Sequence, residues 1–115
     1  MWLITPIGFF SVVQKPGGCD KLTVRARVKS DLQALKAHYL PELGRIQDSS
    51  VNDYRFRALA PRQAVARAFE QMVLQIDYDN FKSEVHRRQG KSRERVYHDV
   101  WGILYRLQVE RVDIR

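Results

Sequence analysis

Residues 21 to 32 read KLTVRARVKSDL, and the alternation in this stretch decides the fold class. Every second side chain is apolar, at Leu22, Val24, Ala26 and Val28. The side chains between them are polar, at Thr23, Arg25, Arg27 and Lys29. Because consecutive side chains of a strand point to opposite faces, the pattern predicts a β-strand with one buried face and one cationic face.

A second stretch, YRFRALA at residues 54 to 60, repeats this alternation. Its apolar side consists of Tyr54, Phe56 and Ala58, and its cationic side of Arg55 and Arg57. We therefore predict a second strand with a cationic face. The preceding segment, residues 44 to 53, is polar and rich in turn formers, and we expect a surface loop there.

The start of the chain predicts a β-hairpin. Residues 2 to 5 and 7 to 14 are rich in aromatic and β-branched side chains, which favour strands. The Pro-Gly-Gly run at residues 16 to 18 predicts a turn, because glycine adopts positive φ at no steric cost. Residues 21 to 28 then return as the second arm of the hairpin.

Helical patterns follow the hairpin. Ser30 and Gln33 stand in the capping-box order Ser-x-x-Gln, which predicts a helix to about Leu40. Pro61 suits the first turn of a second helix, whose apolar positions recur at helical spacing. The inward positions of the two helices are expected to be Leu32, Leu35, Tyr39, Val65, Ala68, Phe69, Met72, Val73 and Ile76.

Two more helices are predicted in the last third of the chain. Phe81 and Val85 mark a short helix that Gly90 ends. The last helix runs from about Ser92 to Leu107, and the tail, residues 108 to 115, fits either frayed helix or a short strand. The last helix is expected to bury Val96, Val100, Ile103, Leu104 and Leu107.

Together these elements predict an α+β fold in the order β-β-α-β-α-α-α. A small antiparallel or mixed β-sheet with helices packed on one face would cover the apolar sides of both strands. We expect a single domain over residues 1–115, since 115 residues provide one ordinary hydrophobic core.

Composition limits the partners and the compartment. The chain has 20 Lys and Arg against 13 Asp and Glu, a formal net charge of +7, which favours nucleic acid or an acidic protein as partner. The single cysteine, Cys19, cannot form an internal disulfide, so we expect a reducing, cytoplasmic location. We expect neither a membrane span nor a signal peptide, because no apolar run is long enough and the start lacks a basic leader.

The first candidate site is the cationic sheet face, made of Arg25, Arg27, Lys29, Arg55 and Arg57. On neighbouring strands these charges would repeat about every 7 Å along each strand, near the phosphate spacing of a nucleic-acid strand. Phe9 or Phe10 must point to the same face, where a ring can stack on a base. The alternative is a solvated exterior, because an open sheet needs a polar outer face.

The second candidate is the run HRRQGKSRER, residues 86 to 95, around a helix break. Its cations are Arg87, Arg88, Lys91, Arg93 and Arg95. Cations in the first turn of a helix oppose its dipole, and a bound anion would relieve that repulsion. Since no glycine-rich phosphate loop accompanies the run, the alternative is again a solvated surface.

The third candidate is the aromatic stripe of YHDVWGILY, residues 97 to 105, formed by Tyr97, Trp101 and Tyr105. An enzyme would use His98 beside it as a general base, with a carboxylate such as Asp77 or Asp79. The alternative is that the aromatic residues extend the core. The three histidines lack metal-ligand spacing, and no cofactor motif is present, so we expect neither a metal nor a cofactor.

Three motifs together resemble a family of short, uncharacterised bacterial proteins: GFFSVVQ at residues 8–14, LTVRARV at 22–28 and YHDVW at 97–101. The resemblance extends over most of the chain. It implies a bacterial cytoplasmic protein, and it transfers no site because the family has no assigned activity.

From the sequence we expect a non-enzymatic binding module whose cationic sheet face meets an anionic partner, nucleic acid first and an acidic protein second. One alternative is a small enzyme or ligand-binding domain that uses the region from Tyr97 to Trp101. The other is a homodimeric interaction protein that pairs through a sheet edge or an apolar patch.

Overall fold

The computed structural model of the chain describes residues 1–109 and divides the chain into two compact units, Met1–Asp77 and Tyr78–Arg115. The α+β class is confirmed, with the order β-β-β-α-β-β-α-α-α. The observed order contains two more strands than the predicted one. The opening segment forms two strands, and the predicted loop contains a two-residue strand. The expectation that the whole chain acts as one domain stays a prediction.

The first unit contains a five-stranded antiparallel sheet in the order β1-β2-β3-β5-β4. The strands are β1 (Trp2–Thr5), β2 (Gly8–Val13), β3 (Lys21–Ala26), β4 (Gln47–Asp48) and β5 (Phe56–Pro61). The two strands with cationic faces, β3 and β5, are direct neighbours. A helix, α1 (Lys29–His38), connects β3 to the segment that carries β4, and α2 (Arg62–Leu74) follows β5.

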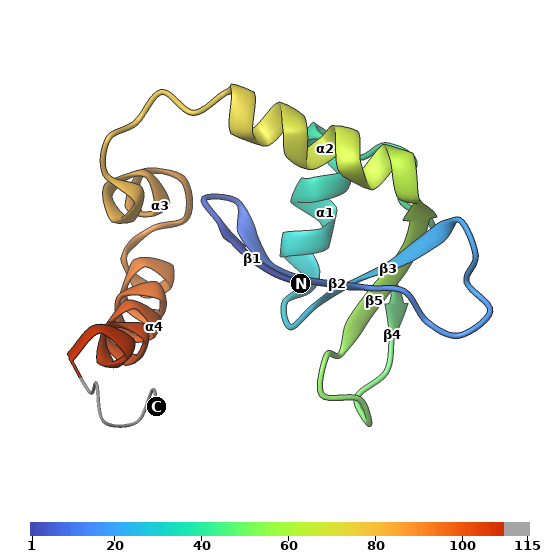
Figure 1. The fold of residues 1–115 in the computed structure, drawn as a ribbon, viewed down its shortest axis with the longest axis horizontal. Helices are drawn as coiled ribbons and strands as arrows, with labels where there is room; N and C mark the ends of the chain where they lie inside the picture. Colours follow the sequence, from blue (N-terminus) through green and yellow to red (C-terminus); the bar gives the residue numbers. More distant parts are fainter. Residues whose placement is uncertain (110–115) are drawn as a thin grey trace. The chain divides into compact units, whose positions relative to one another are not determined.

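One face of the sheet carries the hydrophobic core. In Figure 1 both α1 and α2 lie above the sheet, and their apolar sides pack on the same cluster as the inward side chains of the strands. Phe10 is fully buried there, and its ring lies 6.1 Å from the ring of Phe69 on α2. The buried members are Phe10, Val12, Val24, Ala26, Leu32, Leu35, Leu40, Leu43, Ala58, Ala60, Ala64, Val65 and Ala68. The predicted inward side of the strands is therefore confirmed at Val24, Ala26 and Ala58.

The alternation ends earlier than predicted at the end of β3. The strand stops at Ala26, and Val28, predicted to be inward, is an exposed N-cap residue of α1. Lys29 is the first residue of α1 and does not belong to the strand. The predicted capping box of Ser30 is wrong as well, because no side chain caps the N-terminus of the helix.

Asp31 connects the start of α1 to β2. Its Oδ2 accepts a hydrogen bond of 3.0 Å from the backbone N–H of Phe9, which lies beyond the last β2–β3 pair. The carboxylate thus replaces the strand carbonyl that this donor lacks. The helix approaches so closely that a Cβ on Gly8 would lie 2.7 Å from the Cβ of Asp31.

We expect Asp31→Ala to lower the free energy of unfolding by about 1 to 3 kcal/mol, because it leaves the N–H of Phe9 without its acceptor. Urea unfolding measures the effect. The matched control is Asp20→Ala, an exposed aspartate in a turn, with an expected change below about 0.5 kcal/mol. Equal losses in both variants would contradict this role of Asp31.

The apolar stripe of α2 is shorter than predicted. Val65 and Ala68 are buried, and Phe69 and Met72 pack on the core from its margin. Val73 and Ile76 were predicted to be inward, and both are exposed. Ile76 lies beyond the end of the helix at Leu74, and Val73 projects away from the buried side of α2.

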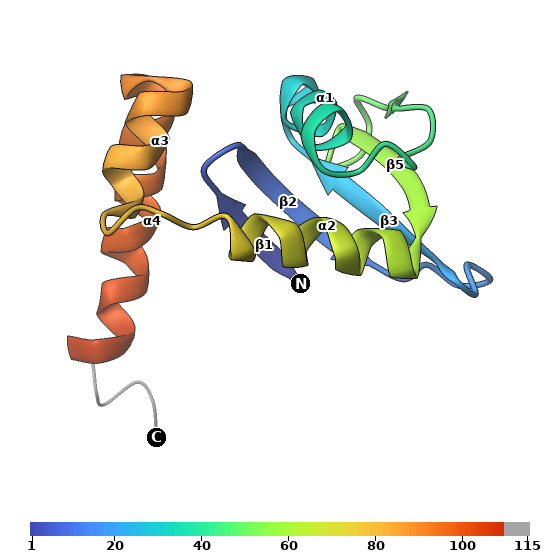
Figure 2. The ribbon, with the colours of Figure 1, turned by 90° about the horizontal axis from the view of Figure 1, so that it is seen from above.

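The second unit is a helical hairpin of α3 (Phe81–Gln89) and α4 (Lys91–Val109), which lie side by side in Figure 2. Asn80 caps α3 through its Oδ1, and Gly90, with φ of 91°, ends it. Inside the hairpin, the rings of Phe81 and Tyr97 stack 5.8 Å apart. Within residues 1–109 no helix combines the length and the hydropathy that crossing a bilayer requires.

The predicted burial on α4 is wrong for most of its aliphatic side chains. Four of the five are exposed: Val96, Ile103, Leu104 and Leu107. The physical reason is that α3 packs on another side of α4, where Tyr97 lies. Of the tail, residues 108 and 109 belong to α4, and the remaining predictions fall on residues 110–115, which lie outside the described residues.

Candidate nucleic-acid interface

The predicted cationic face is the side of the sheet opposite α1 and α2, here called the outer face. The strand register places one row of side chains straight across it, because paired residues of neighbouring strands share a face. This row consists of Trp2, Ser11, Arg25, Arg57 and Gln47. Arg25 and Arg57, taken from separate stretches of sequence, are therefore direct cross-strand neighbours.

Tyr54 lies on the outer face, although its position in YRFRALA predicted the apolar side. The guanidinium carbons of Arg25 and Arg27 lie 4.5 and 4.4 Å from its ring centroid. The alternation does not apply to Tyr54, because β5 begins only at Phe56 and Tyr54 belongs to the preceding loop. With 3% of its surface exposed, Tyr54 is a buried ring between two arginines.

A line of aromatic rings continues from Tyr54 across the outer face. The ring of Phe9 lies 6.3 Å from Tyr54, and that of Trp2 lies 5.6 Å from Phe9 in an edge-to-face arrangement. Phe9 is thus the residue that faces outward, and Phe10 is in the core. Trp2 ends the line with 69% of its surface exposed, so one large ring is open to a partner.

Three arginines of the outer face are held by neutral acceptors. Arg25 Nη2 donates to Ser11 Oγ at 2.6 Å, and Arg27 Nη1 donates to the carbonyl of Asp53 at 2.8 Å. Arg57 Nη2 donates to the carbonyl of Tyr54 at 3.3 Å. The part of the chain that the structure describes gives none of the three a carboxylate partner. Their side chains are therefore positioned while their charges remain available.

The other two predicted cations do not share this state. Arg55 forms two hydrogen bonds to the carboxylate of Asp48, at 2.7 and 3.2 Å, and these bonds lower the pKa of the Asp48 carboxyl. Lys29 is exposed at the start of α1. Of the five predicted cations, the structure thus brings together Arg25, Arg27 and Arg57, and none of the three forms an ion pair within residues 1–109.

A hollow of about 210 Å³ opens beside Arg57. It is lined by Lys15, Thr23, Gln47, Arg57, Ala58 and Leu59. Two of these side chains are cationic and two are neutral hydrogen-bonding groups, a composition that suits an anionic or polar ligand. No pattern in the sequence predicts that Lys15, Thr23 and Gln47 meet, because the pairing of β3, β4 and β5 places Gln47 near Thr23 and Lys15 comes from the loop between β2 and β3.

Three polar atoms of this region are buried without a hydrogen-bond partner among residues 1–109: Arg25 Nε, Arg57 Nε and the Tyr54 hydroxyl. A buried donor without an acceptor is costly, and such groups are rare in folded proteins. The outer face therefore presents positive charge and an exposed aromatic ring, above buried polar atoms that have no partner among residues 1–109.

The second predicted cluster does not converge on one point. Arg87 and Arg88 both bind the carboxylate of Glu84, at 2.6 Å in the closest contact of each. The Glu84 side chain is only 6% exposed, and its hydrogen bonds from Arg87 and then Arg88 lower its pKa to about 2. Arg93 lies instead over the ring of Tyr97. The i, i+3 and i, i+4 spacing from Glu84 was the signal in the sequence that identifies this pairing.

The Glu84 ion pairs predict a dependence of stability on acid. Because folding lowers this pKa from 4.5 to about 2, the pairs stabilise the hairpin above about pH 4.5, and the stabilisation is lost as the pH falls toward 2. We expect Glu84→Gln to lower the melting temperature at pH 6 and to have a much smaller effect at pH 2. The control is Glu70→Gln, an exposed glutamate of α2, and an equal change at both pH values for Glu84→Gln would contradict the pairing.

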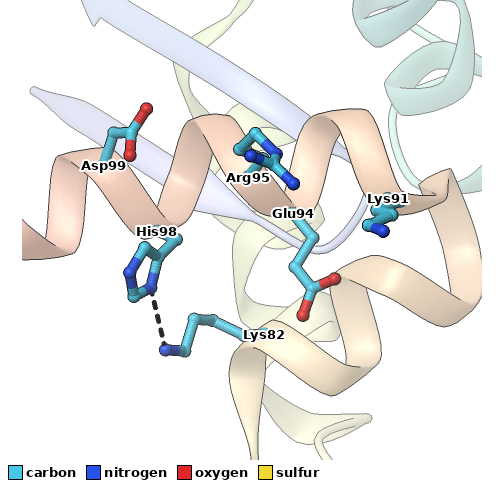
Figure 3. Close-up of a pocket in the computed structure, with 6 residues that line it drawn as sticks. All are labelled: Lys82, Lys91, Glu94, Arg95, His98 and Asp99. Carbon is cyan, nitrogen blue, oxygen red and sulfur yellow. Dashed lines mark hydrogen bonds between the residues drawn. The ribbon is translucent and has the colours of Figure 1, made fainter.

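The third candidate region lies at a second hollow, of about 390 Å³, in the helical hairpin. Its lining consists of Lys82, Lys91, Glu94, Arg95, His98 and Asp99 (Figure 3). Figure 3 shows Lys82 reaching from α3 to His98, whose Nδ1 lies 3.2 Å from the ammonium nitrogen. In the predicted enzyme a carboxylate would orient His98 as the general base. In the structure the ring nitrogen of His98 instead contacts the ammonium group of Lys82.

The rest of the aromatic stripe is a surface feature of α4. The rings of Trp101 and Tyr105 stack 5.4 Å apart, and His98 stacks on Trp101 at 5.9 Å. Tyr97 lies apart from them against α3. Among residues 1–109, no group of three or more His, Cys, Asp or Glu side chains could hold a metal ion. The enzyme alternative stays a prediction.

Comparison with known proteins adds no function: no family model, no curated protein and no solved structure matches the chain. The resemblance of its motifs to a bacterial family stays a prediction. The function is therefore argued from the side chains of the outer face.

Proposed function

We propose that the outer face binds single-stranded nucleic acid, with arginines on the phosphates and aromatic rings stacked on the bases. The observation that carries the proposal is the pair of arginines on neighbouring strands, Arg25 and Arg57, which have no carboxylate partner among residues 1–109 and lie on the face where the ring of Trp2 is exposed. Phosphate oxygens accept hydrogen bonds from guanidinium groups, and the planar guanidinium matches the geometry of a phosphate.

A solvated exterior accounts poorly for this surface. An outer face that only keeps the sheet in solution needs exposed charges, whereas Arg25 and Arg57 are half-buried. Such a face also needs no line of aromatic rings ending in an exposed tryptophan. The burial of the arginines against Tyr54 instead holds them in fixed positions, which reduces the entropy lost on binding a ligand.

Nucleic acid is favoured over an acidic protein by the aromatic residues. Trp2 and Phe9 offer ring faces that stack on bases, and stacking contributes about 1 to 3 kcal/mol per base. A single strand exposes its bases to a sheet, whereas a duplex hides them in the stack. The single cysteine, exposed in a turn, agrees with the expected cytoplasmic location of such a partner.

Fluorescence anisotropy tests the proposal with labelled single strands of about ten nucleotides, within the range that small binding folds cover. We expect wild type to bind random RNA more tightly than a lysozyme-like basic control at physiological salt, and to prefer the single strand over a duplex. Binding no tighter than the control would contradict the proposal. Equal binding of polyglutamate would show that the partner is an acidic protein instead.

A further inference from the structure

A regular apolar seam runs along α4 on the side turned away from α3. Its members are Val96, Val100, Ile103 and Leu107, at successive spacings of four, three and four residues. Ile103 is 62% exposed, and Val96 and Leu107 are exposed as well. The contacts of α3 with α4 are made by Tyr97 and His98. Because a helix turns by about 100° per residue, these two residues lie on a different side of α4 from the seam.

The spacing of the seam is that of a coiled coil. Alternating steps of four and three residues repeat every seven, which keeps apolar side chains on one line when two helices wrap around each other. Leu104, 54% exposed, lies beside Ile103 and widens the apolar strip on one side of the seam. The seam is therefore shaped for another helix.

The seam is complementary to itself when two copies of α4 run antiparallel. In one register Val96 of each copy lies opposite Leu107 of the other, and Val100 opposite Ile103. All four seam residues then have a partner, and both copies use the same surface, as a two-fold axis requires. Each of these layers pairs a valine with a larger aliphatic side chain, so the layers have similar volumes.

Charges beside the seam select this orientation. Asp99 and Arg106 lie along one edge of the seam, seven residues apart. In the antiparallel register Asp99 of each copy faces Arg106 of the other, which gives two pairs of opposite charge. In a parallel pair Asp99 would face Leu104 instead, so the charge complementarity exists only in the antiparallel form.

We propose that α4 pairs antiparallel with α4 of a second copy of this chain through Val96, Val100, Ile103 and Leu107. The proposal is independent of nucleic-acid binding, because none of these residues belongs to the outer face.

Sedimentation equilibrium of the full chain tests the pairing between about 1 and about 300 µM, the range of moderate affinities. We expect a shift toward twice the chain mass of 13.5 kDa as the concentration rises. Ile103→Glu should weaken the dimer by at least about a hundredfold, because it places a charge in the buried seam. The matched control is Val109→Glu, 53% exposed on the far side of α4, with dimerisation unchanged within about threefold.

A charge exchange tests the orientation. Asp99→Arg should weaken the dimer, and the double variant Asp99→Arg with Arg106→Asp should restore it, since each new arginine again faces an aspartate. A wild type that remains monomeric at every concentration overturns the proposal, and so does an Ile103→Glu variant that dimerises like wild type. A double variant without recovery overturns the antiparallel register.

Discussion

Replacing Arg25 and Arg57 together by alanine is expected to lower the salt dependence of RNA binding. The slope of log affinity against log salt concentration should fall by about 1.4, because each phosphate neutralised on a single strand adds about 0.7. The structure places the two guanidiniums on neighbouring strands with no carboxylate partner among the described residues, so both charges are available to phosphates. Anisotropy over a salt series, with labelled single-stranded RNA, measures the slope.

The matched control removes two charges elsewhere. Lys91→Ala with Arg95→Ala takes the same charge from α4, at the hollow of the helical hairpin. If only total charge matters, both double variants should lower the slope equally, which would contradict binding at the outer face. A fall confined to the control would assign binding to the hairpin. Because Arg25 bonds Ser11, urea unfolding of each variant must first show a folded chain.

Phe10→Ala is expected to lower the free energy of unfolding by about 3 to 5 kcal/mol, the usual cost of removing a buried ring. Phe10 is fully buried at the centre of the first unit, between the sheet and α2. Phe69→Ala should cost less, since Phe69 is half-buried at the margin of the same core. Urea unfolding measures both, and a loss below about 1 kcal/mol for Phe10→Ala would show that the core is wrongly placed.

The sequence predicted the strands of the sheet better than the residues at which the strands begin and end. A period of two in residues 21–28 and 54–60 identified the inward side of β3 and β5, because burial acts on every second side chain of a strand. The pattern fails where the strand ends, at Val28 and at Tyr54, since a residue outside the ladder is no longer bound to one face. The strand β4 has two residues, too few to produce a pattern.

The candidate site was predicted in part for the same reason. Alternation alone places Arg25 and Arg57 on the polar side of their strands, and their adjacency depends on the strand order, which no local pattern encodes. Trp2 joins the face only through the pairing of β1 with β2. The ion pair of Arg55 with Asp48 depends on β4. Through this pair Asp48 balances one of the positive charges that the sequence predicted for the site.

On α4 the helix was predicted and its surroundings were not. The aliphatic spacing marks a side of the helix that is unfavourable in water, and it does not say whether the cover comes from the same chain or another one. Within the hairpin, α3 covers the side of Tyr97 and leaves Ile103 exposed. A pattern of apolar residues thus predicts a contact without identifying the partner.

The central claim, that the outer face binds single-stranded nucleic acid, is tested most directly by NMR through the two tryptophan indoles. The chain has 2 tryptophans, Trp2 at the end of the outer face and Trp101 on α4, so each indole N–H signal reports on one unit. On titration with a short single-stranded RNA, we predict a saturable shift of the Trp2 signal and of the Ser11, Arg25 and Arg57 amides, with the Trp101 signal unchanged. A shift of Trp101 alone, or no shift at saturating RNA, would contradict the claim.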